Sequence, residues 1–153
     1  MRYIVGRLLL LFMLSLPMAV FGAPSGFVFQ GQIEKPDGST LEDPSVDFTV
    51  EVYSPANDCV LYQETYSGID MSGTNGIFSF NVGSGTRSGV SYEDTSTIEQ
   101  AFDNSLPNQT GLTCTAGTTY DPAPGDIRKL RLTFNDGSGP VTISQDHNVS
   151  SVP

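Results

Sequence analysis

The chain has 153 residues, with seven basic and 17 acidic side chains and a formal net charge of −10 at pH 7. This balance disfavours binding to nucleic acid, because contacts to phosphate need clustered Lys and Arg. The same negative charge would be repelled by an anionic membrane surface, and it is otherwise explained by solubility. The length fits one domain with a single hydrophobic core.

Residues 1–22 are typical of an export signal. Arg2 and Arg7 precede an apolar run from Leu8 to Val20, and a small-residue cleavage site ends at Gly22. The run is shorter than the about 20 residues needed to span a bilayer. We therefore expect a secreted, periplasmic or cell-surface protein with one domain over residues 23–153 and no membrane span. Removal of the signal takes away two basic residues and no acidic one, so the formal charge becomes −12.

Two cysteines, Cys59 and Cys114, remain in a chain sent to an oxidising compartment. We predict one intramolecular disulfide between them, closing a loop of about 55 residues and stabilising the fold by roughly 4 kcal/mol in the chain-entropy model. Two free thiols or an intermolecular bond are the alternatives. A zinc site needs more ligands than these cysteines and His147 supply, so no metal and no cofactor are predicted.

Alternation of apolar and polar residues predicts β-strands through most of the chain. The pattern is clearest around Phe78 and Phe80, where Asn75-Gly76 precedes the strand and can take the left-handed backbone angles of a tight turn. The expected strands, in chain order, are Gly26–Ile33, Val46–Val52, Cys59–Ser67, Gly76–Gly83, Leu112–Thr115, Ile127–Asn135 and Val141–Ser144, with an extended tail at His147–Pro153.

Thr95–Asn104 carries the one helical signal after the export signal. Ser96 and Glu99 have the spacing of a capping box. The apolar residues of the helix, at i, i+3 and i+4, are Ile98, Ala101 and Phe102. We expect this helix to lie across an open end of the fold.

About seven short strands between Gly, Pro and Asn turns, with one short helix, predict an all-β antiparallel β-sandwich of the immunoglobulin or prealbumin type. Aromatic and aliphatic side chains of two facing sheets would form the core. We expect the buried set to include Phe78, Phe80, Leu130 and Leu132.

No catalytic residues are predicted. The glycine-rich stretch Gly83–Gly89 fits neither the dinucleotide-binding nor the P-loop spacing and reads as a flexible loop. The carboxylate pairs, Glu51 with Glu64 and Glu93 with Asp94, are explained by solvated strand faces. A hydrolase would need such a pair across a cleft, or a nucleophile with a base, and is the least favoured class. Acidic turns suggest oxygen ligands for Ca²⁺, but no calcium-binding pattern is present.

Tyrosines provide the one candidate ligand surface. Tyr53, Tyr62, Tyr66 and Tyr92, with Tyr120, could stack against sugar rings, although tyrosines at sandwich edges are common. Together with the loop Ser84–Tyr92 they favour a second hypothesis, a small extracellular module that binds a glycan or a peptide.

Several segments occur in an order that is typical of a known family: Phe29–Ile33, Phe48–Pro55, Gly76–Gly83, Phe102–Asn104, Asp126–Phe134 with Asp136-Gly137, and Val149–Pro153. Together they resemble the N-terminal β-sandwich of secreted trimeric fibre proteins, the tail-fibre-like surface adhesins of Gram-negative and predatory bacteria. The resemblance implies a non-enzymatic structural or anchoring role, with self-association in a fibre and target recognition elsewhere. Members of that family continue into a stalk about where this sequence ends.

Overall fold

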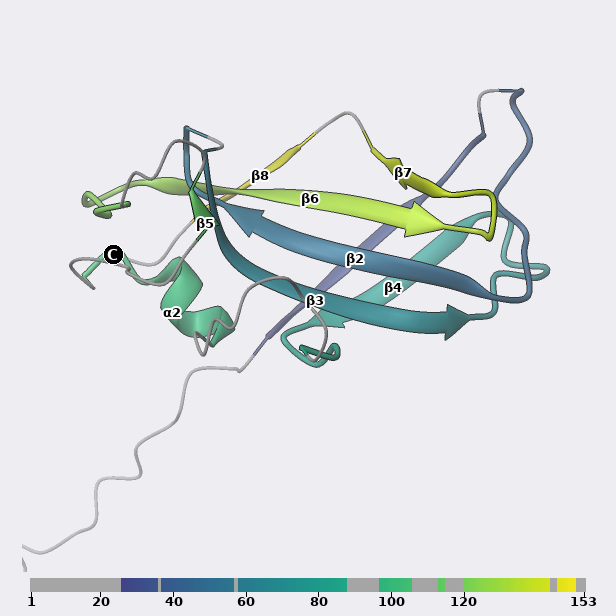
Figure 1. Cartoon of the computed structure of the whole chain (residues 1–153), viewed down its shortest axis with the longest axis horizontal. Helices are drawn as coiled ribbons and strands as arrows, with labels where there is room; N and C mark the ends of the chain where they lie inside the picture. Colours follow the sequence, from purple (N-terminus) through teal and green to yellow (C-terminus); the bar gives the residue numbers. More distant parts are fainter. Residues whose placement is uncertain are drawn as a thin grey trace, which may run out of the picture.

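The computed structural model describes residues 26–35, 37–56, 58–87, 97–105, 113–114, 120–143 and 146–150. Within them, eight strands form two antiparallel sheets with one short helix (Figure 1). The predicted export signal and Tyr92 lie outside the described residues. The elements are β1 Phe27–Gln32, β2 Val46–Tyr53, β3 Cys59–Ile69, β4 Ile77–Val82, α2 Ile98–Phe102, β5 Thr113–Cys114, β6 Ile127–Asn135, β7 Pro140–Thr142 and β8 His147–Ser150.

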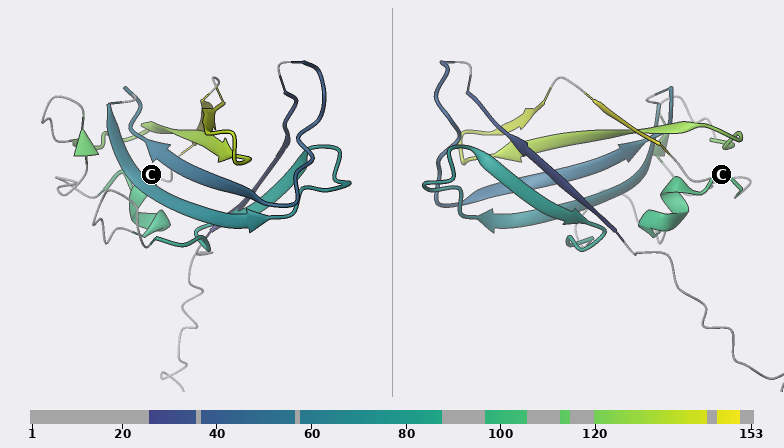
Figure 2. Two further views of the ribbon diagram at one scale, coloured as in Figure 1. Left: turned by 45° about the vertical axis from the view of Figure 1, so that its right-hand side comes forward. Right: turned by 180° about the vertical axis from the view of Figure 1, so that it is seen from behind.

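The two sheets differ in size. β1 and β4 form the small sheet, and the large sheet has the order β5-β3-β2-β6, with β7 and β8 both paired to β6. The views in Figure 2 show the large sheet curving across one side of the small sheet. The prediction of an all-β antiparallel sandwich is therefore confirmed. The strand limits differ from the predicted ones by one to a few residues. For example, the strand predicted at Val141–Ser144 begins at Pro140 and ends at Thr142.

The core lies between the two sheets. Phe48 on β2 stands at its centre, with ring centroids 4.8 Å from Phe80 and 5.8 Å from Phe78 on β4. On the neighbouring strand β6, Phe134 lies 6.5 Å from the same ring. Contacts between aromatic side chains of both sheets therefore hold the layers together. The residues predicted to be buried, Phe78, Phe80, Leu130 and Leu132, are all in this core.

The turn before β4 follows its sequence signal. Asn75 and Gly76 have φ angles of 54° and 74°, and the amide of Ile77 donates to the carbonyl of Thr74 at 3.2 Å. Both central residues are left-handed, as a two-residue turn of this kind requires. β4 then pairs with β1 over its full length, from Phe27 opposite Val82 to Gln32 opposite Ile77.

Helix α2 is shorter than predicted and its capping box lies one residue later. Thr97, not Ser96, is the N-cap: its hydroxyl accepts from the amide of Gln100, whose side chain accepts from the amide of Thr97 at 2.8 Å. Both pairs fit the Ser/Thr-x-x-Glu/Gln spacing, so the pattern alone could not separate them. The three apolar residues of the helix are buried, as predicted. Figure 1 places the helix at one end of the sandwich.

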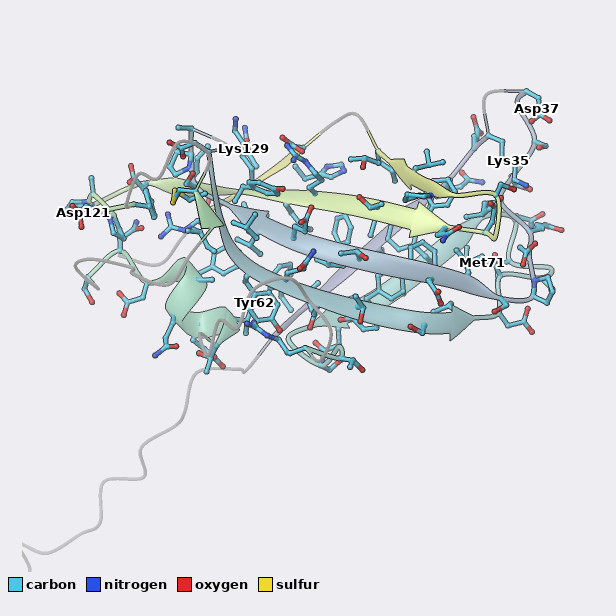
Figure 3. All side chains as sticks on the ribbon, in the orientation of Figure 1. Lys35, Asp37, Tyr62, Met71, Asp121 and Lys129 are labelled. Carbon is cyan, nitrogen blue, oxygen red and sulfur yellow. A yellow bond between two sulfur atoms is a disulfide. The ribbon has the colours of Figure 1, made fainter. Side chains whose placement is uncertain are left out.

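The disulfide between Cys59 and Cys114 is present, which confirms the predicted pairing. The two residues lie directly opposite each other at the start of β3 and in β5. The bond therefore ties the two-residue strand β5 to the edge of the large sheet. In Figure 3 this bond lies at the end that carries α2, whereas Lys35 and Asp37 lie at the other end.

Candidate binding groove

Of the tyrosines predicted to form one exposed surface, the described ones, Tyr53, Tyr62 and Tyr66, do not share a face. Tyr62 is only 4% exposed and faces the inside of the sandwich from β3. Tyr66 shares that face and stacks on Phe80 with centroids 4.6 Å apart. Tyr53 lies on the outer face of the large sheet, where the Arg131 guanidinium covers its ring at 4.2 Å. The prediction is therefore wrong for Tyr62, because side chains two apart on a strand share a face and this face is the buried one.

Glu64, predicted to be solvated, is fully buried between the two inward tyrosines. The hydroxyls of Tyr62 and Tyr66 donate to its carboxylate at 2.9 and 2.7 Å. The backbone amides of Gly83 and Gly85 donate to the same carboxylate, at 2.8 Å for Gly85. We call these five residues the Glu64 cluster. It satisfies a buried charge, because four donors surround the two oxygen atoms.

The Glu64 cluster explains the glycines that follow β4. A Cβ built on Gly85 would lie 2.9 Å from the Glu64 carboxylate, so only glycine allows the amide to approach this closely. The chain then runs beside β3, where the backbone of Thr86 exchanges two hydrogen bonds with that of Thr65. The start of this stretch therefore does bind an anion through backbone amides, but the anion is the protein's own side chain. Burial and the bond to Glu64 raise the pKa of the Tyr62 phenol to about 12.

Arg128 on β6 is the second buried charge, with no exposed surface. Its Nε donates to the carbonyl of Ala101 at 2.6 Å, and its terminal nitrogens donate to Asn104 Oδ1 and the Tyr120 hydroxyl, both at 2.8 Å. These contacts attach α2 and the chain after it to β6. Burial lowers the pKa of the guanidinium, although the Tyr120 and Asp126 side chains oppose this effect.

The outer face of the large sheet is polar. Arg131 forms a bidentate pair with Asp146, at 2.9 and 3.1 Å, while it covers Tyr53. Burial raises the pKa of the neighbouring Glu51, although the Tyr53 hydroxyl and Arg131 favour its charged form. Next to this group a row of threonines crosses four strands in register, beside a shallow hollow of about 340 Å³. The row consists of Thr65, Thr49, Thr133 and Thr142.

A groove of about 370 Å³ opens where the small sheet leaves the large sheet uncovered. One wall is β1 and the other is formed by β6 with the β7 and β8 region. Its base is apolar, and His147 packs its ring 5.6 Å from Phe29 across the opening. The residues that line it are Phe29, Gln30, Gly31, Gln32, Phe78, Leu132, Ile143 and His147.

β1 presents an unpaired edge beside this groove. The amide of Ile33 bonds to the carbonyl of Gly76 on the β4 side, at 2.9 Å. Because pairing in an antiparallel ladder alternates, the backbone groups of Phe27, Phe29 and Gly31 also point to β4. The N–H and C=O groups of Val28, Gln30 and Gln32 therefore point away from it. Among the described residues, no backbone group bonds to these six.

The described residues offer this site hydrogen-bonding and packing groups. Among them, no three His, Cys, Asp or Glu side chains gather closely enough to hold a metal ion. In the part of the chain that the structure describes, no helix is long and apolar enough to cross a membrane. The arrangement is suited to binding an extended chain, because an open strand edge provides donors and acceptors and the groove provides apolar surface.

Sequence reasoning missed the strand edge and both buried charges. One signal for the Glu64 cluster was present: Glu64 lies two residues from a tyrosine on each side, so all three share a face. Arg128 has a weaker signal, because it alternates in phase with Leu130 and Leu132. The pairing partners of β1 depend on the whole topology and have no local signal.

The fold and the groove define a disulfide-bonded, antiparallel β-sandwich-like domain with a free strand edge. The chain belongs to a family of domains of unknown function, DUF8740, whose model matches residues 28–120. The matched stretch contains the free edge of β1, the Glu64 cluster and both cysteines, and it ends before β6. No curated protein and no solved structure matched the chain.

Proposed function

We propose that this protein is a secreted, non-enzymatic structural module that anchors an extracellular fibre or adhesin through contacts with protein. The observation that carries the proposal is the free edge of β1 beside an apolar groove, in a sheet of only two strands. An incomplete sheet is suited to joining another chain, because its backbone groups are already oriented for pairing. The resemblance of the sequence segments to fibre proteins supports the same role.

The way the chain uses its polar groups also supports a structural role. Glu64 and Arg128 are fully buried, and each is surrounded by groups of the protein itself. His147 packs against an aromatic ring. Such groups hold elements together, in contrast to the exposed, perturbed groups that favour catalysis. The disulfide is compatible with an oxidising extracellular or periplasmic compartment.

The proposal is tested by the mass of the protein in solution. Residues 23–153 are purified alone and with any sequence that follows Pro153 in the gene, and each is measured by light scattering after gel filtration. We expect the longer protein to form a defined oligomer. A monomer in both cases would contradict the fibre role.

A glycan-binding module is the second candidate, favoured by the hydroxyl-rich hollow over Thr49 and Thr133. Hydroxyl groups and the nearby Arg131–Asp146 pair can hydrogen-bond a sugar. A glycan array with the wild type and the Thr49→Ala variant tests it. Binding that is lost in the variant supports this candidate, and an absence of binding across the array rejects it.

A further inference from the structure

We propose that β1 takes up one extended segment of a partner protein, which pairs with its free edge and places alternate apolar side chains in the groove. We further infer that this segment has basic flanks. The inference rests on the proposed function and names the kind of joint that the module makes.

The edge supplies the backbone part of this joint. Val28, Gln30 and Gln32 present three N–H and three C=O groups over the length of one short strand. An incoming strand at the usual spacing would meet all six. Val28 is 66% exposed and the two glutamines are exposed as well, so side chains do not cover this edge.

The groove supplies the side-chain part. Phe29, Phe78 and Leu132 form its base, and the cavity of about 370 Å³ has room for apolar side chains. Gly31 keeps it open, because a Cβ at this position would lie 2.9 Å from the Phe78 ring. A paired strand directs every second side chain to one side. A segment whose apolar residues alternate with polar ones therefore fits the groove and leaves its polar residues in water.

The charge of the chain favours basic flanks. The formal net charge is −10, and three of the few basic side chains are already engaged or buried. Lys35 faces Asp136 at 3.6 Å, Arg131 pairs with Asp146, and Arg128 is buried. A second copy of this chain would bring a second large negative charge, whereas a basic segment would be attracted.

The test uses the synthetic peptide Lys-Lys-Val-Thr-Val-Thr-Val-Lys-Lys and the full mature protein. Two control peptides separate the causes of binding: Lys-Lys-Val-Val-Thr-Thr-Val-Lys-Lys breaks the alternation, and Glu-Glu-Val-Thr-Val-Thr-Val-Glu-Glu reverses the charge. We expect the first peptide to bind and both controls to bind about tenfold more weakly or worse. If the peptide with the broken alternation bound as tightly as the first peptide, the proposal would be overturned.

Two proline variants test the edge itself. Gln30→Pro removes one N–H that points away from β4, a position where a strand tolerates proline. Ser79→Pro, directly opposite on β4, makes the same change at the other edge of the same sheet and serves as the matched control. Loss of one paired N–H weakens peptide binding about tenfold for Gln30→Pro, and Ser79→Pro leaves it unchanged. Equal effects of the two variants would contradict pairing at β1.

Amide exchange gives an independent readout. The peptide should slow exchange at Val28, Gln30 and Gln32 and leave the amide of Ser79 unchanged, because only the first three point to the incoming strand.

Self-association that is lost in Gln30→Pro, without peptide binding, would assign the edge to a second copy and overturn the basic partner. Peptide pairing with a monomeric longer protein would reject the fibre role alone. Failure of the peptide to bind, with oligomers of the longer protein that persist in Gln30→Pro, would reject the strand joint alone.

Discussion

Tyr66 donates a hydrogen bond of 2.7 Å to Glu64, two residues before it on the same face of β3. The same hydroxyl lies 2.9 Å from the carbonyl oxygen of Asn81, the last residue but one of β4. This one side chain therefore links the large sheet, the buried carboxylate and the small sheet. Its ring adds a stacked contact with Phe80. The Glu64 cluster thus fixes the edge of the small sheet that lies opposite the groove.

Loss of the Glu64 carboxylate should destabilise the fold strongly. In Glu64→Leu the Tyr62 and Tyr66 hydroxyls and the amides of Gly83 and Gly85 lose their common acceptor. We expect the free energy of unfolding to fall by about 3 kcal/mol, because buried donors left unpaired carry the full cost of desolvation. Urea unfolding measures this change.

Glu34→Gln is the control for that variant, because Glu34 is an exposed carboxylate near the end of β1. We expect its effect to stay within about 0.5 kcal/mol, as for most surface substitutions. A stable Glu64→Leu protein would show that the tyrosines and glycines find other partners, such as water.

Much of this fold follows from sequence, and the reason lies in the strands. Val46, Phe48, Val50 and Val52 alternate without a break, and the strand they predict is the central strand of the large sheet. Burial on one face imposes that pattern, so it can be recognised locally. The single disulfide follows from composition and compartment in the same way.

The site could not be predicted from the sequence. Glutamate side chains usually lie in water. The burial of Glu64 depends on amide donors from Gly83 and Gly85, which follow β4 and are distant in the sequence. The free edge of β1 depends on which strands do not pair with it, which is a property of the whole topology. Both features arise from long-range contacts that residue patterns do not encode.

Removal of the disulfide should weaken the fold by an amount set by the length of the closed loop. Cys59 and Cys114 are separated by 55 residues in the sequence. In the chain-entropy model a loop of this length corresponds to about 4 kcal/mol. We expect the Cys59→Ser, Cys114→Ser double variant to lose close to this amount in urea unfolding, with the same loss in reduced wild type. An unchanged midpoint after reduction would contradict the prediction.

Arg128→Met should detach α2 from the large sheet. The substitution keeps much of the side-chain length but removes the donors to Ala101, Asn104 and Tyr120. We expect a loss of about 3 kcal/mol, since acceptors around a buried charge are left unpaired. Amide exchange in the helix should accelerate more than exchange in β2.

Lys129→Met is the matched control for Arg128→Met, because Lys129 is the next residue of β6 and points to the outer face of the sheet. It should change stability by about 0.5 kcal/mol or less. If both variants behave alike, the Arg128 contacts do not hold the helix.

The stability of the protein should depend on pH in opposite ways at Glu51 and Asp126. Burial raises the pKa of Glu51 above its ordinary value of 4.5, so the folded state binds its proton more tightly than the unfolded state. Stability from this group is therefore present below about pH 4.5 and is lost as the pH rises through the folded pKa. Hydrogen bonds from the Ala123 amide and the Tyr120 hydroxyl lower the pKa of Asp126 below 3.8, so its contribution is present above that value and lost in acid.

Urea unfolding of two variants from about pH 3 to about pH 7 tests both signs. Relative to wild type, Glu51→Gln should gain stability as the pH rises past about 4.5, because the amide carries no charge that burial penalises. Asp126→Asn should instead lose stability relative to wild type as the pH rises, because the wild-type carboxylate accepts its two hydrogen bonds best when it is ionised. If the stability of both variants relative to wild type changed in the same direction as the pH rises, the result would contradict the different surroundings of these two carboxyl groups.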